Sequence, residues 1–163
     1  MTHDTIQEDI LRLATAKEVT LTCAESCTGG MLAAALTDLP GSSAMFEYGF
    51  VTYSNVAKVK LLNVKQETLD LYGAVSEPTV CEMALGALLL SEADFSVAIS
   101  GIAGPGGSDH KPEGRVCFAL ARRGEGEKPK VSAETVEFGA LGRDQVRQVS
   151  QNHALELFYS ALS

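Results

Sequence analysis

The stretch LTCAESCTGG, residues 21–30, joins an apolar run to a cluster of small polar residues and two glycines. Its first half is typical of a buried strand, and the glycines ahead of an alanine- and leucine-rich run are typical of a turn into a helix. Ser26, Cys27 and Thr28 lie at this turn, and each has a hydroxyl or thiol that can attack a substrate. The stretch therefore predicts a strand–turn–helix unit and raises the question of which side chain does chemistry.

Outward from this stretch, expected strands and helices alternate along most of the chain. We expect strands at 19–24, 45–54, 95–100, 115–122 and 130–138, and helices at 5–16, 29–40, 55–64, 76–93 and 142–163. The alternation predicts a single α/β domain, a three-layer α/β/α sandwich with a mixed, mostly parallel sheet. Ligands of such sheets bind beyond the carboxyl ends of the strands.

Three of the expected helices begin near residues that can cap a helix. Ser76 is followed by Pro78 in the first turn, which is a strong start signal. Ser54 or Asn55 is a plausible cap for the helix at 55–64. Thr28 is expected to cap the helix that follows the two glycines.

Composition limits the functions that the chain can have. It has 163 residues, 45% of them hydrophobic, which is enough for one packed domain. The formal net charge of −8 argues against a nucleic-acid binder but leaves room for a small anionic ligand. No stretch is long and apolar enough to span a membrane, and residues 1–10 lack the pattern of a signal peptide. We therefore expect a cytoplasmic protein without membrane contact.

The cysteines give no sign of a metal or a disulfide framework. No pair has the CxxC spacing, and no histidine stands near a cysteine at zinc-ligand spacing. Cys23 and Cys117 lie in apolar, strand-like runs, so we expect buried free thiols there. We expect no metal and no cofactor.

Polar clusters follow three of the expected strands, at 24–30, 52–58 and 100–107. If these strands are parallel, the three clusters open on one crevice at the same edge of the sheet. The third cluster, SGIAGPGG, leaves bare amides that can cradle a phosphate or a carbonyl oxygen. Its composition fits a flexible surface loop equally well.

The second cluster contains a candidate general base. Lys58 stands in the first turn of an expected helix, just after Tyr53 at the end of a strand. A helix N-terminus and partial burial both lower the pKa of a lysine. The alternative is an ordinary solvated lysine, which is how we interpret Lys60.

The nucleophile needs a base, and the histidines do not provide one. His3 is in the N-terminal tail, His110 in a charged loop and His153 in the last helix. No Ser-His-Asp order is evident, and a serine–lysine pair is the arrangement left over. Cys27 stays open as an alternative nucleophile if it can form a thiolate.

The runs AESCTGG, GSSAMFEYGFVTYSNVAKVKLL, GAVSEPTV and SGIAGPGG, taken together, resemble the CinA C-terminal domain family, the bacterial nicotinamide-nucleotide amidohydrolases. The resemblance covers nearly the whole chain and implies one amidohydrolase domain over 1–163. It implies hydrolysis of the carboxamide of nicotinamide mononucleotide to nicotinate mononucleotide and ammonia, without a metal. It also implies a homodimer or a higher homo-oligomer.

The resemblance also implies the roles of individual residues. Ser26 is expected as the nucleophile and Lys58 as the base, with Tyr53 assisting. From its position in the chain, Glu25 is expected either to orient a neighbour or to be an exposed or capping carboxylate. The residues expected at the substrate are Thr28, Gly29, Gly30, Ser43, Ser100, Gly101, Gly104, Gly106 and Arg143, the last of these at the phosphate.

Another class of function remains open at this point. The same family motifs would occur in a nucleotide-binding or regulatory module that is linked to competence or DNA damage and catalyses no reaction. Ammonia release from nicotinamide mononucleotide distinguishes the two.

Overall fold

The computed structural model describes residues 5–163 and contains one five-stranded mixed sheet. The strand order is β2-β1-β3-β4-β5. The strands are β1 (Leu21–Glu25), β2 (Phe46–Val51), β3 (Phe95–Gly101), β4 (Arg115–Arg122) and β5 (Lys130–Glu137). The pairs of β1 with β2 and with β3 are parallel, and the pairs of β4 with β3 and with β5 are antiparallel. Only β4 therefore runs against the other strands, and the predicted mixed, mostly parallel sheet is confirmed.

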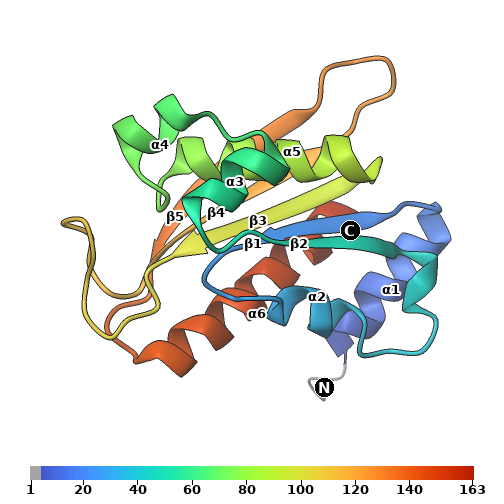
Figure 1. Ribbon diagram of the computed structural model, residues 1–163. Coiled ribbons are helices and arrows are strands. Elements are labelled where there is room, and N and C mark those ends of the chain that lie inside the picture. Colours follow the sequence, from blue (N-terminus) through green and yellow to red (C-terminus); the bar gives the residue numbers. More distant parts are fainter. Residues whose placement is uncertain (1–4) are drawn as a thin grey trace.

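Helices cover both faces of this sheet (Figure 1). One layer contains α1 (Thr5–Lys17), α2 (Met31–Leu36) and α6 (Arg143–Leu162), and the other contains α3 (Asn55–Leu62), α4 (Gln66–Tyr72) and α5 (Glu77–Ser91). Each layer buries its own apolar core against the sheet, one around Phe118 and Phe158 and the other around Met83 and Leu88. The predicted three-layer α/β/α sandwich is confirmed.

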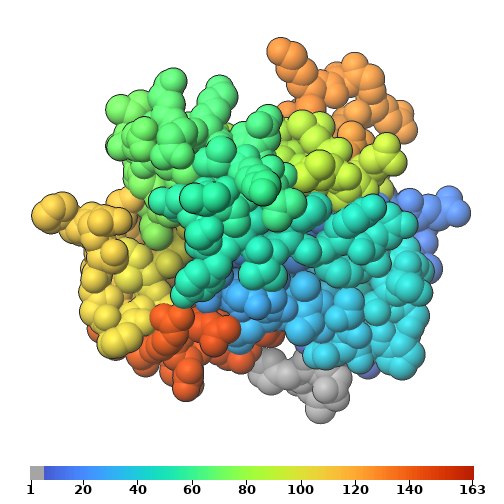
Figure 2. Space-filling view, viewed as in Figure 1, coloured from blue at the N-terminus to red at the C-terminus, as the bar shows by residue number. Residues whose placement is uncertain are grey.

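The chain leaves β1 and β2 toward opposite faces, which creates a crevice at the carboxyl end of β1. The connection from β1 to β2 runs through α2 on one face, and the connection from β2 to β3 runs through α3, α4 and α5 on the other. Such a reversal is where ligands of open α/β sheets bind. The loop from β3 to β4 leaves the sheet at the same end and forms one margin of the molecule (Figure 2).

Several local predictions hold, and two are wrong. Ser54 and Ser76 do cap α3 and α5, each accepting a hydrogen bond from a backbone amide of the first turn. Thr28 does not cap α2, because that helix begins only at Met31 and Gly30 occupies the cap position, with φ 109°. The helix α4 was not predicted, because its seven residues are too few for a clear period.

No helix in the part of the chain that the structure describes has the length and apolar character needed to cross a membrane.

Candidate functional site

Lys58 is the centre of the candidate site. It is the fourth residue of α3, and only 1% of its surface is exposed, so it is not the solvated lysine of the alternative interpretation. Its Nζ lies 2.9 Å from Ser26 Oγ and donates to the carbonyl oxygens of Thr52, at 2.8 Å, and Tyr53, at 3.0 Å. Burial lowers the pKa of Lys58 from 10.5 to about 8. The amine therefore has an accessible neutral form near physiological pH.

Ser26 is held in place by the sheet. It follows β1 directly, and its amide donates to the carbonyl of Ile99 in β3, at 3.0 Å. Its hydroxyl lies between Lys58 Nζ and the carbonyl oxygen of Tyr53, the latter at 3.5 Å. Because Ser26 follows β1 and these partners come from β3, the β2–α3 connection and α3, only the assembled fold brings the hydroxyl and the amine together.

Glu25 fixes the turn that carries Ser26. This fully buried carboxylate accepts hydrogen bonds from the amides of Leu32, at 2.9 Å, and Ala33, at 3.0 Å, in the first turn of α2. It also accepts from the hydroxyl of Thr28, at 2.6 Å. Glu25 thus takes the capping role that we had expected of Thr28, and its negative charge suits the positive end of a helix.

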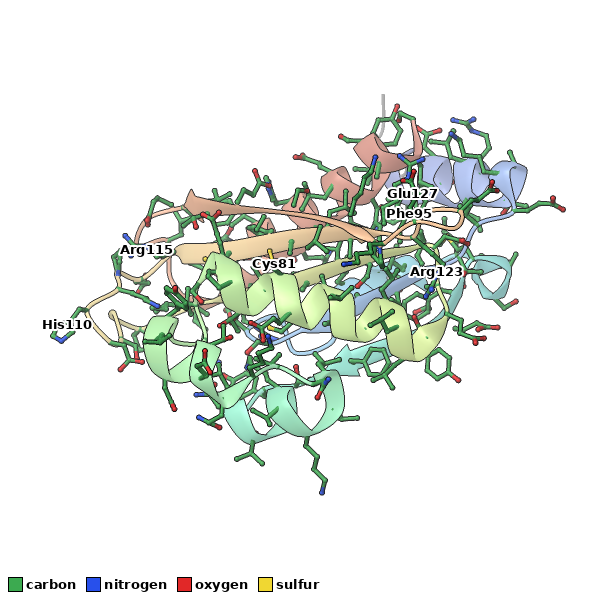
Figure 3. All side chains as sticks on the ribbon, turned by 90° about the horizontal axis from the view of Figure 1, so that it is seen from above. Cys81, Phe95, His110, Arg115, Arg123 and Glu127 are labelled. Carbon is green, nitrogen blue, oxygen red and sulfur yellow. The ribbon has the colours of Figure 1, made fainter. Side chains whose placement is uncertain are left out.

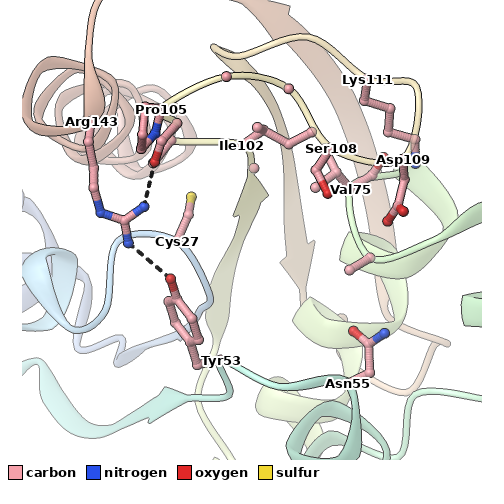
Figure 4. A pocket seen from close by; sticks show the side chains of 16 residues that line it. Cys27, Tyr53, Asn55, Val75, Ile102, Pro105, Ser108, Asp109, Lys111 and Arg143 are labelled. Carbon is pink, nitrogen blue, oxygen red and sulfur yellow. Dashed lines mark hydrogen bonds between the residues drawn. The ribbon is translucent and has the colours of Figure 1, made fainter.

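A pocket of about 370 Å³ opens beside Cys27 and Tyr53 (Figure 4). Cys27 and Tyr53, the neighbours of Ser26 by sequence and by contact, line it, and the loop from β3 to β4 forms its opposite wall. Arg143, at the start of α6, reaches across one end and donates to the carbonyl of Gly104, at 2.7 Å, and to the hydroxyl of Tyr53, at 3.0 Å. The volume fits a small-molecule ligand of nucleotide size.

Five of the twelve predicted site residues line this pocket. Gly101, Gly104, Gly106 and Arg143 line the pocket directly, as does Tyr53. The remaining predicted residues do not line it.

Three of these remaining residues, Thr28, Gly29 and Gly30, form the turn that leads from Ser26 into α2, and Thr28 is buried. Ser100 is buried near the carboxyl end of β3. Ser43 is exposed in a short 3-10 turn (Ser42–Ala44) that precedes β2, at the amino end of that strand. The chain does not bring Ser43 to the pocket.

Cys27 has the wrong protonation state for a nucleophile. Its side chain points into the pocket in Figure 4, yet it is only 6% exposed. Burial raises the pKa of its thiol to about 11. The thiol therefore stays protonated near neutral pH, and reactivity belongs to the thiolate. The structure favours Ser26 over Cys27.

One cation at the site was missed by the sequence reasoning. Arg147 donates from Nε to the carbonyl of Cys27, at 3.1 Å, and from Nη2 to the carbonyl of Thr28, at 3.3 Å. Its spacing of four residues from Arg143, on one face of a helix, was the available signal.

The cations around the pocket lack acidic partners. None of the salt bridges formed by residues 5–163 includes Arg143, Arg147, Lys58 or Lys111. Their donors point to backbone carbonyls instead, apart from the contacts of Arg143 with Tyr53 and of Lys58 with Ser26. In this acidic protein the lining of the pocket thus has two cations, Arg143 and Lys111, against one carboxylate, Asp109, and this balance suits an anionic ligand.

Among the described residues, no group of three or more His, Cys, Asp and Glu side chains is arranged to hold a metal ion.

Comparisons with known proteins show which family the chain resembles. A family model described as the CinA C-terminal domain matches residues 3–162. The Escherichia coli K12 protein named nicotinamide-nucleotide amidohydrolase PncC is 49% identical over 156 residues, which are 94% of this chain and 91% of that protein. A Symbiobacterium thermophilum protein named putative competence-damage inducible protein is 51% identical over 159 residues, 95% of this chain but 37% of that protein.

Solved structures show the same fold over the whole length. The CinA-superfamily protein from Klebsiella pneumoniae 700603 has a TM-score of 0.91 and 37% identity, over 99% of this chain and 98% of that one. The competence/damage-inducible protein from Agrobacterium tumefaciens has a TM-score of 0.87 and 44% identity, over 96% of this chain and 94% of that one. With matching fold, motifs and sequence, the chain belongs to the CinA C-terminal domain family.

Proposed function

We propose that this protein hydrolyses the carboxamide of nicotinamide mononucleotide to nicotinate mononucleotide and ammonia, with Ser26 as nucleophile and Lys58 as base. The observation that carries the proposal is the 2.9 Å contact between a buried lysine amine and a serine hydroxyl beside the pocket. The substrate follows the names of the relatives in Escherichia coli and Enterobacter agglomerans, both called nicotinamide-nucleotide amidohydrolase.

The contacts of Lys58 suit the role of a base. A neutral amine has two N–H donors and one lone pair. The carbonyl oxygens of Thr52 and Tyr53 accept the two donors, so the lone pair is left for the third neighbour, the hydroxyl of Ser26. The O–H of Ser26 then donates to the amine, which is the arrangement needed to remove its proton.

The reaction proceeds in two balanced halves. Ser26 Oγ bonds to the amide carbon while its proton passes to Lys58 Nζ. The carbon–nitrogen bond of the tetrahedral intermediate then breaks, Lys58 returns the proton to the leaving nitrogen, and ammonia departs. Water next attacks the acyl-enzyme carbon and gives a proton to Lys58. The bond to Ser26 Oγ breaks, the hydroxyl recovers that proton and nicotinate mononucleotide leaves.

Two features of the pocket support a nucleotide as substrate. Arg143 and Lys111 line the pocket and form no salt bridge among the described residues, so a phosphate finds two cationic donors there beside the single lining carboxylate, Asp109. The backbone amide of Cys27, directly after Ser26, is free to stabilise a developing oxyanion, because it finds no acceptor within residues 5–163 and Cys27 lines the pocket.

Ammonia release from nicotinamide mononucleotide by the purified protein tests the proposal. Ser26→Ala should abolish release and Cys27→Ala should keep much of it, with the fold intact in both. Release that survives Ser26→Ala but is lost in Cys27→Ala would reverse the assignment of the nucleophile.

The base is tested with a matched pair of lysines on α3. Lys58→Arg keeps the charge but cannot lose its proton, so it should be nearly inactive, while Lys60→Arg, at an exposed position, should be tolerated. In the wild type, kcat/KM should rise as pH increases through about 8, because only the neutral amine accepts a proton. A fully active Lys58→Arg variant would eliminate Lys58 as the base.

A further inference from the structure

Arg147 makes two hydrogen bonds to backbone carbonyls beside the nucleophile. From α6 it donates to the carbonyls of Cys27 and Thr28, the two residues that follow Ser26. Its guanidinium is half-buried and takes part in no salt bridge within residues 5–163. It also lies close to Gly29, where an added Cβ would stand 3.4 Å from Nη2. The residue thus covers the whole turn between Ser26 and α2.

One of the two carbonyls leads to the free amide beside Ser26. A peptide unit is planar, so holding the Thr28 carbonyl also fixes the direction of the Gly29 N–H. That N–H donates to the Ser26 carbonyl at 3.1 Å. The peptide of the Ser26 carbonyl carries the N–H of Cys27, a residue that lines the pocket, and this N–H has no acceptor among the described residues. A positive charge on these carbonyls also polarises the peptides and strengthens their N–H donors.

The opposite side of the same turn is held by Glu25. This carboxylate binds the Thr28 hydroxyl and the amides of Leu32 and Ala33. The turn therefore lies between two charged groups. The Glu25 carboxylate holds the Thr28 hydroxyl and the first turn of α2, and the Arg147 guanidinium holds the carbonyls of the turn. A donor held from both sides needs little reorganisation when negative charge develops on the substrate.

We propose that Arg147 is a positioning residue for the oxyanion site: through the Thr28–Gly29 peptide it orients the Ser26–Cys27 peptide so that the Cys27 N–H meets the oxygen of the tetrahedral intermediate. This inference rests on the proposed amidohydrolase function. Arg147 acts through the backbone and leaves phosphate binding to the cations that line the pocket. Its loss should therefore lower kcat and leave KM nearly unchanged.

A second arginine of the chain provides a matched control. Arg123 donates from Nε to the carbonyl of Ala93, at 2.9 Å, and from Nη2 to that of Leu88, at 2.7 Å. It thus uses the same two nitrogens on two carbonyls. It lies at the end of the sheet opposite to His110 and the pocket loop (Figure 3). Arg123→Met measures what such a carbonyl clamp contributes to stability alone.

The experiment compares Arg147→Met, Arg147→Lys and Arg123→Met with the wild type in ammonia release and melting temperature. Deleting one oxyanion donor typically lowers kcat about 10²- to 10³-fold, and misaligning it should cost up to that much. We expect a large fall in kcat for both Arg147 variants, because lysine cannot reproduce the two-pronged contact. The pH midpoint near 8 should not move, because the contacts of Lys58 are untouched. Arg123→Met should keep the wild-type kcat.

Amide hydrogen exchange at Gly29 tests the same idea without turnover. Exchange should be faster in Arg147→Met and Arg147→Lys than in the wild type, and unchanged in Arg123→Met. A wild type that releases no ammonia would remove the proposed function, while the exchange result would still decide whether Arg147 holds the turn. Unchanged exchange, a kcat equal to that of Arg123→Met, or a loss confined to KM would each overturn the positioning role.

Discussion

Replacing Lys58 by methionine should remove a pH dependence of stability that the wild type has. Methionine is similar in length but carries no charge, so it keeps most of the packing around this buried position. The pKa of Lys58 lies near 10.5 when solvated and at about 8 in the folded protein. Between these two pH values the unfolded chain holds a proton that the folded protein has lost. The free energy of unfolding therefore rises with pH across this window.

The size of the effect follows from the two pKa values. Their difference is 10.5 − 8, or about 2.5. At about 1.4 kcal/mol for each pH unit, the wild type should gain about 3 kcal/mol of stability between pH 8 and pH 10.5. Below pH 8 the buried ammonium destabilises the folded state by the full amount. The Lys58→Met variant should lack this rise.

Urea unfolding of both proteins at intervals from pH 7 to pH 10.5 measures the effect. The difference between the two curves isolates Lys58, because the four thiols and the other lysines titrate in both proteins. Lys60→Met, at an exposed position of the same helix, should behave as the wild type does. A difference curve that is flat between pH 8 and pH 10.5 would show that the pKa of Lys58 is not lowered, and the argument for a neutral amine would be lost.

Three further variants test the pocket and the packing beneath it. Arg143→Ala should weaken binding of nicotinamide mononucleotide roughly 10- to 100-fold more than binding of the riboside that lacks the phosphate. The reason is that a hydrogen bond to a charged group contributes about 1.5–3 kcal/mol. Equal losses in titrations with both ligands would contradict a phosphate contact. Gly86→Ala should lower the melting temperature and kcat together, because the new Cβ would overlap the carbonyl oxygen of Leu62 and push α3, which carries Lys58, away from α5. A variant with unchanged melting and kcat would show that this close approach is not needed. Ser96→Ala should leave the free energy of unfolding unchanged or raise it, because the buried Ser96 hydroxyl finds no partner among the described residues; a loss above about 1 kcal/mol in urea unfolding would indicate a bound partner for this hydroxyl.

The sequence by itself determined the features that depend on neighbours along the chain. The alternation of strands and helices, the caps Ser54 and Ser76 and the glycines at the end of the first strand depend on residues one to four positions apart. Local hydrogen bonds and backbone preferences decide such features, so a single sequence contains the signal. The family motifs likewise placed Ser26 and Lys58 in one site from sequence alone.

The tertiary structure decided the features that depend on groups far apart in the sequence. Thr28 has the right chemistry for a cap, but Glu25 accepts its hydroxyl and takes the helix amides, because β1 delivers a buried carboxylate to that point. Nothing in the residues around Lys58 shows that α3 will be covered, yet desolvation by that covering lowers its pKa. Arg147 reaches the Ser26 turn across some 120 residues, which no local pattern can show. The sequence thus determined which groups are present, and only the packing of the three layers decided which are buried and which meet.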